Sequence, residues 1–360
     1  MWPRAPRCGK NNRAENLDDK PSLYVMQTMR PLLKKLLRKL LRILAGLALA
    51  LIVLWTVLFM TLRQPNFGHT AVQAEGKAEP EILRRHVVHL TENIVPRDAD
   101  HPKNLSLAAD YIRAAFEAGS GRVEEQTFDV DGEPYRNVSV FFGPETGPRL
   151  VVGAHYDAFG MFGPNPGADD NASGTAGLLE LARLLSRNAP SLPVELVAYA
   201  NEEPPNYASD GMGSAVHAKS LAEAGIDVRA MICLEMIGYF TDEQPWPNVL
   251  YSMLYPNTGD FIGVVGRFDD RKLVRRWKRA MRRPELPVYS FTGPSFVPGL
   301  DASDHRNYWH LGYPALMVTD TAFMRNPNYH TAGDTADSLS YGPMAHVVDS
   351  VLAGILSEKP

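Results

Sequence analysis

A stretch of 20 residues without a charged side chain, residues 43–62, constrains the fold of this chain more than any other feature. Its sequence is ILAGLALALIVLWTVLFMTL. A helix of this length extends roughly 30 Å, enough to cross the hydrocarbon core of a bilayer. The alternative is a buried core helix. We favour a membrane span because the run is apolar on all sides and basic residues accumulate on one side only.

Charge is distributed unevenly around this run. Residues 1–42 contain eleven Lys and Arg against three acids, whereas residues 63–360 contain 26 against 38. Six of the basic residues lie just before the run: Arg30, Lys34, Lys35, Arg38, Lys39 and Arg42. The positive-inside rule therefore predicts a cytoplasmic amino terminus and an acidic domain on the extracytoplasmic side of the cell membrane.

A cleaved signal peptide is the competing interpretation of the same region. Its apolar core normally has only about 7–15 residues, with a small-residue cleavage site close behind. Here the apolar run is longer, and the nearest plausible site, at residues 72–74, lies too far downstream. An uncleaved signal anchor is favoured.

These features predict four segments. Residues 1–30 are expected to form a disordered cytoplasmic tail, 31–62 a basic amphipathic segment and anchor in contact with membrane lipid, and 63–80 a linker. Residues 81–360 are expected to form one folded domain. That domain contains a single cysteine, Cys233, which we interpret as a buried core thiol, so no disulfide is available within it.

The domain alternates between helical and strand patterns. Apolar residues recur at helical spacing in 81–93 and 106–118, and a strand pair follows at 123–130 and 137–142. Further strands are expected at 150–154, 193–200 and 231–236, separated by helices at 173–187 and 212–224. This alternation predicts a three-layer α/β domain with a mostly parallel, mixed central sheet flanked by helices.

Possible metal ligands and a possible general base lie in short, separate blocks: His155 in GAHYDAF, Asp170 in GADDNASG, Glu202 and Glu203 in YANEEPP, Glu235 in LEMIG and His330 in NYHTAGD. Three of these blocks, those of His155, of the two glutamates and of Glu235, directly follow apolar runs of strand character. Sites assemble at the carboxyl ends of strands in open α/β sheets. Two imidazoles and three carboxylates, with one carboxylate left over, suit a pair of zinc ions that share a bridging ligand.

The adjacent glutamates are expected to have different roles. Two metals can share a water and lower its pKa, and a nearby carboxylate must then accept the proton and pass it to the leaving amine. Consecutive residues at a strand end point in opposite directions, so Glu203 can reach a metal while Glu202 reaches the water. The alternative is a solvated loop with two acids.

The ordered blocks resemble those of the co-catalytic zinc aminopeptidases, which include secreted bacterial leucyl aminopeptidases and have relatives among glutamate carboxypeptidases and glutaminyl cyclases. The resemblance spans roughly residues 81–358. It implies that one zinc is bound by His155 and Glu235, the other by Glu203 and His330, and that Asp170 bridges them. Many members have Asp where this chain has Glu235, which leaves the identity of the metal more open.

Weaker predictions concern residues around these ligands. Asp157 is expected to accept the second imidazole proton of His155. Asp304 is expected to hold Glu202 in place, and the hydroxyl of Tyr329 to donate to the substrate oxyanion. Asp334 could be a supporting residue or a turn cap, and Asp169 is most simply a turn residue.

The resemblance implies an exopeptidase that removes amino-terminal residues from peptide substrates, with a metal-bridging water activated by Glu202. One alternative is a glutaminyl cyclase-like acyltransferase with one zinc, and another is a noncatalytic receptor-like relative. Nucleic-acid binding is not expected, because the basic residues lie beside the membrane and the outer domain is acidic. The loops at 204–211, 241–248 and 291–300 are expected to shape the substrate pocket.

Overall fold

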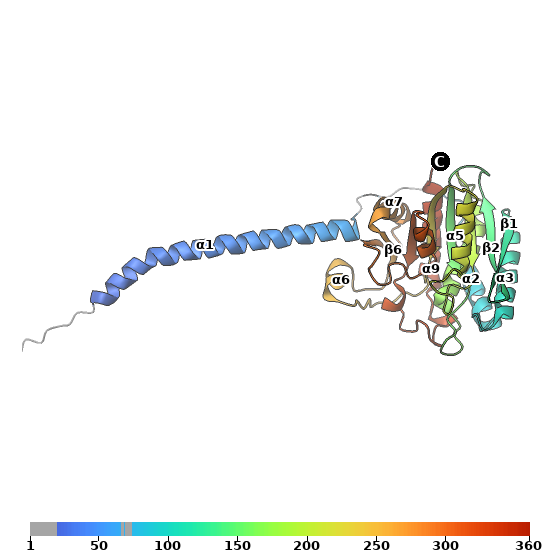
Figure 1. Cartoon of the computed structure of the whole chain (residues 1–360), viewed down its shortest axis with the longest axis horizontal. Coiled ribbons are helices and arrows are strands. Elements are labelled where there is room, and N and C mark those ends of the chain that lie inside the picture. The colour runs from blue at the N-terminus through green and yellow to red at the C-terminus, as the bar shows by residue number, and fades with distance from the viewer. Residues whose placement is uncertain (1–19, 66–67, 69–73) are drawn as a thin grey trace, which may run out of the picture. The chain divides into compact units, whose positions relative to one another are not determined.

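The computed structural model describes residues 20–65, 68 and 74–360 of the chain. The chain divides into two compact units, Met1–Val57 and Leu58–Pro360. Helix α1 (Lys20–Leu58) makes up the described part of the first unit (Figure 1). It is long and apolar enough to cross a membrane, and none of its most apolar stretch is buried.

The described part of α1 begins within the segment that we predicted to be a disordered tail, residues 1–30. Residues 1–19 lie outside the described residues, but residues 20–30 are helical. Pro21 lies in the first turn, where its missing N–H is harmless, and the helix continues through Pro31 with no glycine before Gly46. The helical pattern of the basic segment therefore extends further towards the amino terminus than we expected.

The second unit is built on one eight-stranded sheet with the order β1-β2-β4-β3-β5-β8-β6-β7. Four of its neighbouring strand pairs are parallel and three are antiparallel, so the sheet is mixed and mostly parallel, as predicted. The strands are β1 (Arg122–Val130), β2 (Glu133–Phe142), β3 (Arg149–His155), β4 (Val194–Tyr199), β5 (Val228–Leu234), β6 (Ile262–Arg267), β7 (Val288–Gly293) and β8 (Ala315–Thr319).

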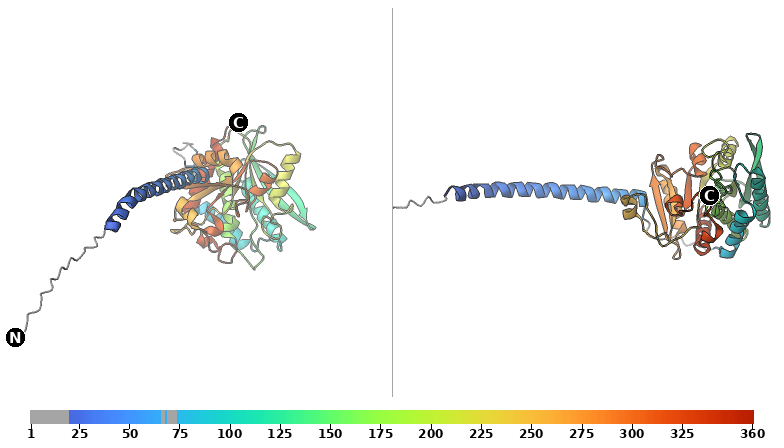
Figure 2. Two further views of the ribbon diagram at one scale, coloured as in Figure 1. Left: turned by 60° about the vertical axis from the view of Figure 1, so that its left-hand side comes forward. Right: turned by 90° about the horizontal axis from the view of Figure 1, so that it is seen from below.

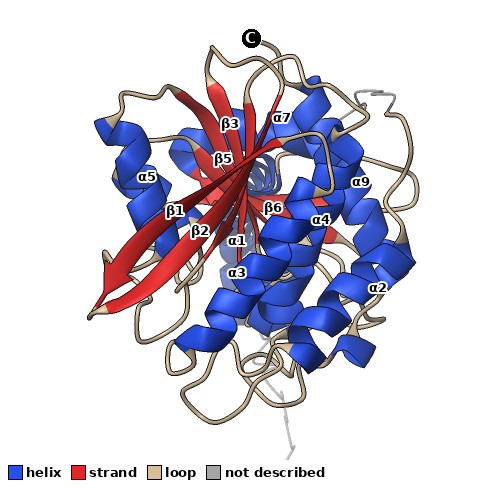
Figure 3. Ribbon diagram, turned by 90° about the vertical axis from the view of Figure 1, so that its right-hand side faces the viewer, coloured by secondary structure: helices blue, strands red, loops and turns tan. Residues whose placement is uncertain are grey.

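Helices cover both faces of this sheet, which confirms the three-layer architecture (Figure 3). One face is covered by α2 (Pro80–Val88), α3 (Pro102–Glu117), α4 (Gly174–Leu185), α7 (Arg271–Met281) and α9 (Tyr341–Ser357). The other face is covered by α5 (Gly213–Glu223) and α8 (His305–His310), while the short α6 (Val249–Leu254) follows β5.

The two faces of the sheet separate the core into two clusters. On the central strand β5, Ile232 packs in the cluster under α4 and α9, whereas its neighbours Met231 and Cys233 pack in the cluster under α5 and α8. This is the two-residue period of a strand buried on both sides. Cys233 is fully buried and free, as expected.

The predicted linker at 63–80 is described only in part, because residues 66–67 and 69–73 lie outside the described residues. Its first residues continue from a π-helical turn, η1 (Phe59–Arg63), that lies against β7. Its last residues contact the domain, since the backbone N–H of Ala78 donates to Asp349 and that of Glu79 donates to Glu180. The described ends of this segment are thus fastened to the domain.

Candidate metal centre

Four neighbouring parallel strands end at the same edge of the sheet and deliver the predicted ligands to it. β3 ends at His155, β4 is followed by Glu202 and Glu203, and β5 is followed by Glu235. His330 lies in the long loop after β8. Sequence segments separated by up to 175 positions, from His155 to His330, therefore meet at one place.

Asp170 joins two groups of side chains with its two carboxylate oxygens. Its Oδ1 lies 3.3 Å from Nε2 of His155, and that nitrogen is also 3.3 Å from Oε2 of Glu235. Its Oδ2 lies 3.1 Å from Nε2 of His330, which is 3.2 Å from Oε1 of Glu203. The five predicted ligands thus form two three-residue groups that share Asp170.

The donor set and its spacing fit zinc. Nitrogen and oxygen ligands bind zinc at about 2.0–2.2 Å in tetrahedral geometry, which places two ligand atoms of one ion roughly 3.3 Å apart. The distances of 3.1–3.3 Å in both groups agree with that separation. Among the described side chains, both ring nitrogens of His155 and Oε1 of Glu203 are buried without a hydrogen-bond partner. Such atoms are expected where an ion completes the site.

The electrostatics of the site are those of crowded, buried acids. Burial, together with the charge of Asp170, raises the pKa of Glu203 to about 8. Burial also raises the pKa of Glu202 well above its usual range. Burial opposes ionisation of Asp170 as well, but its contacts with His155 and His330 hold its pKa below the usual range. Divalent cations would relieve this concentration of negative charge.

The backbone is left-handed beside the ligands from three separate segments. Asn201, directly before Glu202, has φ 57°, Met236, directly after Glu235, has φ 51°, and His330 itself has φ 58°. Residues other than glycine rarely adopt this conformation, and it is concentrated at functional sites. Each of these residues turns the chain at the strand edge so that a ligand faces the centre.

Asp157 and Asp334 position the backbone of the ligand segments. The carboxylate of Asp157 accepts the N–H groups of Glu202 at 3.1 Å and Glu203 at 2.9 Å, and it lies 3.3 Å from Nδ1 of His155. The predicted hydrogen bond from His155 to Asp157 is not formed, because Nδ1 of His155 has no hydrogen-bond partner in the described part of the chain, and the support of both glutamates was not predicted. The carboxylate of Asp334 accepts N–H groups of residues 169 and 170 at 3.0–3.1 Å. It therefore both caps a turn and supports Asp170.

Asn171 and Ser303 support the site and were missed in the sequence. The amide of Asn171 donates to the carbonyl of Leu234 at 2.8 Å, which ties the Asp170 segment to the end of β5. The hydroxyl of Ser303 donates to Oε2 of Glu235 at 2.6 Å. A side chain at Gly174 would collide with both Asn171 and Leu234, so a glycine is required there. The DNASG block contained the signal for Asn171, and Ser303 directly precedes Asp304 in a block, SDHRNYW, that resembles one lining the family's site, but Ser303 itself was given no role.

Two supporting residues differ from expectation. Asp169 is not merely a turn residue: it is fully buried, and it accepts the N–H of Gly238 and the side-chain amide of Asn326, both at 3.0 Å. It ties together the loops after β5 and β8. Both carboxylate oxygens of Asp304 are buried without a hydrogen-bond partner in the described part of the chain, so Asp304 does not hold Glu202 by a hydrogen bond. Asp304 is positioned by the start of α8, and a hydrogen bond between it and Glu202 would require one of the two carboxyl groups to be protonated.

An apolar pocket lies beside the ligands. Tyr329 lines it, and its ring stacks on His330 at 3.7 Å, while Phe159 stacks on His330 at 3.9 Å. The other lining residues include Trp246, Tyr251, Phe261, Phe291, Met317 and Phe323, and Glu235 lies at its inner end. The predicted loops 241–248 and 291–300 contribute to this pocket, but loop 204–211 does not.

Comparisons with known proteins agree with this geometry. Residues 137–355 match the family described as Peptidase family M28. "Uncharacterized protein YfbL" of Escherichia coli (strain K12) is 49% identical over 291 residues, which cover 78% of this chain and 89% of that protein. "Leucine aminopeptidase 1" of Coccidioides posadasii (strain C735) is 30% identical over 226 residues. These cover 58% of this chain and 52% of that enzyme, so the match spans about half its length.

Solved structures share the fold. A leucine aminopeptidase precursor from Bacteroides thetaiotaomicron VPI-5482 has a TM-score of 0.61 at 19% identity, covering 80% of this chain and all of that one. A glutaminyl cyclase from Bacteroides thetaiotaomicron has a TM-score of 0.62 with the same identity and coverage. The family match extends over more than half of the chain, and the chain therefore belongs to peptidase family M28, whose members are peptide hydrolases.

Proposed function

We propose that this chain is a membrane-anchored, zinc-dependent aminopeptidase that removes amino-terminal residues from peptides. The observation that supports this most strongly is the position of Asp170, whose two oxygens each contact a separate His–Glu group. A site with one zinc, as in the cyclase alternative, needs only one such group. All five predicted ligands are intact, which argues against a noncatalytic relative.

His155 and Glu235 would hold one zinc, Glu203 and His330 the other, and Asp170 both. Zinc ions bound there supply an acidified water and polarise the scissile carbonyl. Glu202 is buried beside the ligands and is not needed as one, so it takes the proton from the attacking water and delivers it to the leaving amine. The hydroxyl of Tyr329 lines the pocket and stays protonated, because burial raises its pKa, and it donates to the substrate oxyanion.

The pocket supports a preference for large apolar residues at the amino terminus of the substrate. Its lining is almost entirely aromatic and aliphatic, and it reaches from Tyr329 and Glu235 to Trp246 and Phe291. An apolar substrate side chain loses its contact with water there, which favours binding by about 0.8 kcal/mol per methylene group. Peptides with leucine or phenylalanine at the amino terminus are the expected substrates.

The anchor is the apolar run that begins within α1, with the amino terminus in the cytoplasm and the catalytic domain outside. A reporter enzyme that is active only outside the cytoplasm should work when it is fused after Pro360 and fail when it is fused before Arg30. The opposite result would reverse the orientation, and a mature amino terminus near residue 75 would show that the anchor is removed.

The metal and the reaction can be tested together. The purified full chain should contain close to two zinc ions, lose activity with a chelator and regain it with zinc. Release of leucine from a leucyl amide should be compared with cyclisation of a glutaminyl peptide. One tightly bound zinc together with cyclisation would replace the aminopeptidase by the cyclase, and no turnover of either substrate would support the noncatalytic alternative.

A further inference from the structure

Helix α7 is unusually basic for this domain. Residues 271–283 contain eight Lys and Arg and no acid, whereas the whole of residues 63–360 contains 26 Lys and Arg against 38 acids. Nearly a third of the cations of an acidic domain are thus concentrated in one short segment. A solvated helix face normally mixes both signs of charge, so this composition indicates a surface with a negatively charged partner.

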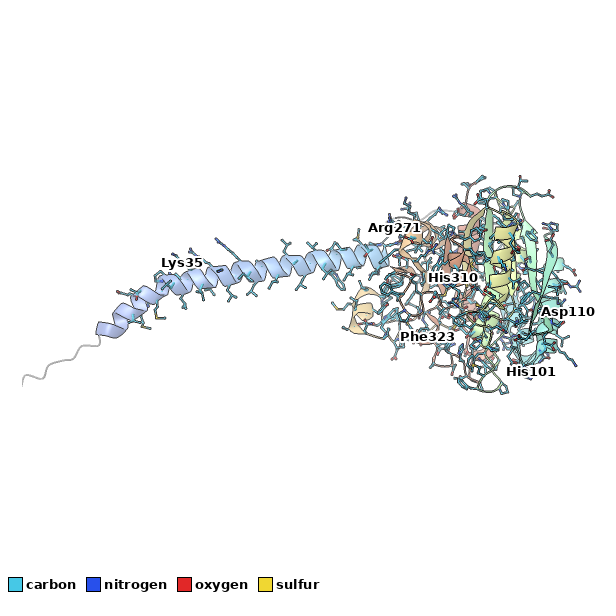
Figure 4. All side chains as sticks on the ribbon, viewed as in Figure 1. Lys35, His101, Asp110, Arg271, His310 and Phe323 are labelled. Carbon is cyan, nitrogen blue, oxygen red and sulfur yellow. The ribbon has the colours of Figure 1, made fainter. Side chains whose placement is uncertain are left out.

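The cations form a continuous exposed stripe. Leu273, Val274, Trp277 and Met281 are buried against the sheet and α9. The exposed positions repeat at a spacing of about four residues along the opposite side, and they are Arg271, Lys272, Arg275, Arg276, Arg279 and Arg282. Figure 4 shows Arg271 at one end of the domain, away from Asp110 on α3. Because the opposite side of α7 is buried in the domain, the stripe has a fixed position on the domain surface.

Two cations, Lys278 on α7 and Arg282 directly after it, donate hydrogen bonds to the part of the chain that directly follows the apolar run. Nζ of Lys278, which is only 4% exposed, donates to the carbonyls of Arg63 at 2.7 Å and Gln64 at 3.1 Å. Arg282 donates to the carbonyl of Gly68 at 3.3 Å. The apolar run ends at residue 62, so the carboxyl-terminal half of α7 contacts the residues that directly follow it.

The same segment is fastened to the edge strand of the sheet. The hydroxyl of Ser290 donates to the carbonyl of Arg63 at 2.8 Å, and that of Thr292 donates to the carbonyl of Thr61 at 2.6 Å. The guanidinium of Arg63 lies over the ring of Tyr289 at 4.8 Å. The end of the apolar run is therefore attached directly to β7, with no free linker between them.

We propose that the exposed face of α7 docks on the anionic phospholipid headgroups of the leaflet from which the anchor emerges. This inference rests on the membrane anchor of the proposed function. Arg275, Arg279 and Arg282 lie within about one turn of Lys278, or roughly 6 Å along the helix. The polar region of a leaflet is about 5–8 Å thick, so these side chains reach it from the anchored position.

The stripe contains more basic residues than there are acids beside it. Glu358 accepts from Arg276, which belongs to the stripe, and from Trp277, while Asp270 accepts from Arg267. The backbone carbonyl of Asp349 accepts from Arg283, and its carboxylate lies 3.9 Å from that guanidinium. The six basic residues of the stripe therefore exceed Glu358 and the exposed flanking acids Asp269 and Glu285. Each basic residue near an anionic leaflet contributes about 1 kcal/mol of attraction. Several such residues on a tethered domain are enough to fix its orientation, because the anchor already supplies a high local concentration.

The order of the strands in the sheet shows which part of the domain lies farthest from α7, and its distance from the bilayer tests the proposed orientation. α7 lies at the β7 edge, and the β1–β2 hairpin forms the opposite edge, about 34 Å away at the usual spacing of strands. Both views in Figure 2 show the hairpin and the α7 region at opposite ends of the domain. Docking through α7 therefore lifts the hairpin away from the bilayer.

The full chain would be placed in lipid nanodiscs with a donor dye on a cysteine introduced at Glu133, in a Cys8→Ser background. Cys233 is buried and stays unlabelled. Acceptor dye is carried by the lipid. Energy transfer should be lower in discs containing phosphatidylglycerol than in discs of phosphatidylcholine alone, and about 0.5 M salt should remove the difference by screening.

Replacement of Arg275, Arg279 and Arg282 by glutamine should abolish the dependence on phosphatidylglycerol. A matched variant that replaces the exposed Arg85, Lys103 and Arg187 should retain it. Equal transfer in both lipids for the wild-type chain would overturn the proposal. So would a lipid dependence that survives in the α7 variant, because the basic residues before the anchor would then be responsible.

The salt dependence of the wild-type chain provides the same test without any substitution. Resistance to extraction from membranes by carbonate is measured first, since its absence would overturn the anchor itself and the docking with it. Loss of peptidase activity alone would contradict the proposed reaction but leave the lipid-dependent energy transfer intact.

Discussion

The metal centre and the joint at β7, where residues 61–64 contact Lys278, Ser290 and Thr292, both bury charged side chains. Only at the joint do all of these side chains have hydrogen-bond partners. At the metal centre, both ring nitrogens of His155 and one oxygen of Glu203 have no hydrogen-bond partner in the described part of the chain. At the joint, Nζ of Lys278 donates to two carbonyls and to the hydroxyl of Ser290. A buried polar group without a hydrogen-bond partner destabilises the fold. Buried groups that lack a partner therefore indicate an external ligand, whereas buried groups that have one indicate a structural role.

The largest expected effect is that of Glu202→Gln. The amide keeps the size of the side chain but cannot accept a proton, so turnover should fall by about two to four orders of magnitude. Both zinc ions should remain bound, because Glu202 is not one of the grouped ligands. Turnover and zinc content would be measured on the same preparation.

Glu203→Gln is the matched comparison at the neighbouring position. It weakens a ligand, so its deficit should lie in zinc occupancy and be restored in part by excess zinc. Rescue of Glu202→Gln by zinc, with no rescue of Glu203→Gln, would reverse the two assignments.

Asp157→Ala should have a smaller effect. It removes the acceptor for the backbone N–H groups of both Glu202 and Glu203, and it should lower activity by about 10–100-fold, the range for residues that orient metal ligands. Asp157→Asn keeps one oxygen and should be less damaged. An Asp157→Ala variant with wild-type turnover would show that the two glutamates are held by the strand alone.

Phe323→Ala tests the pocket beside the metal centre. Phe323 lines the pocket but is 51% exposed, so the substitution should leave the fold intact. Loss of its contact should reduce kcat/KM for a leucyl amide by about 10-fold, with little change for an alanyl amide, whose side chain is too short to reach it. Equal losses for both substrates would place the substrate side chain elsewhere.

Lys278→Met probes the satisfied charge and should give the smallest effect. Burial lowers the pKa of Lys278 to about 7 in the folded chain, whereas the unfolded chain keeps its proton up to about pH 10.5. Between these values the unfolded state binds more protons, so the stability of the wild-type chain rises with pH. Relative to the variant, the free energy of unfolding should rise by up to about 1 kcal/mol per pH unit.

This difference would be measured by unfolding both chains in detergent at pH 7, 8.5 and 10. Parallel stability curves would show that Lys278 keeps its proton when it is folded, and the joint would then contain a permanent buried charge.

Local pattern was sufficient for most of the fold. The strands at 150–154 and 231–236 were recognised because both of their faces are buried, which gives an apolar run. β7 was missed because it is a short edge strand of mixed polarity, VYSFTG. The fastening of residues 59–65 to β7 was also missed, since it depends on contacts between positions more than 200 residues apart.

The sequence by itself determined the chemistry of this protein: which side chains can hold metal, which glutamate is left over, and which segment can cross a membrane. These follow from residue type and from position at the end of a strand. Only the tertiary structure decided the partners of those residues. It assigned Asp157 to both glutamates, Ser303 to Glu235 and Lys278 to the residues that follow the apolar run, because such contacts depend on the packing of distant segments and leave no periodic trace along the chain.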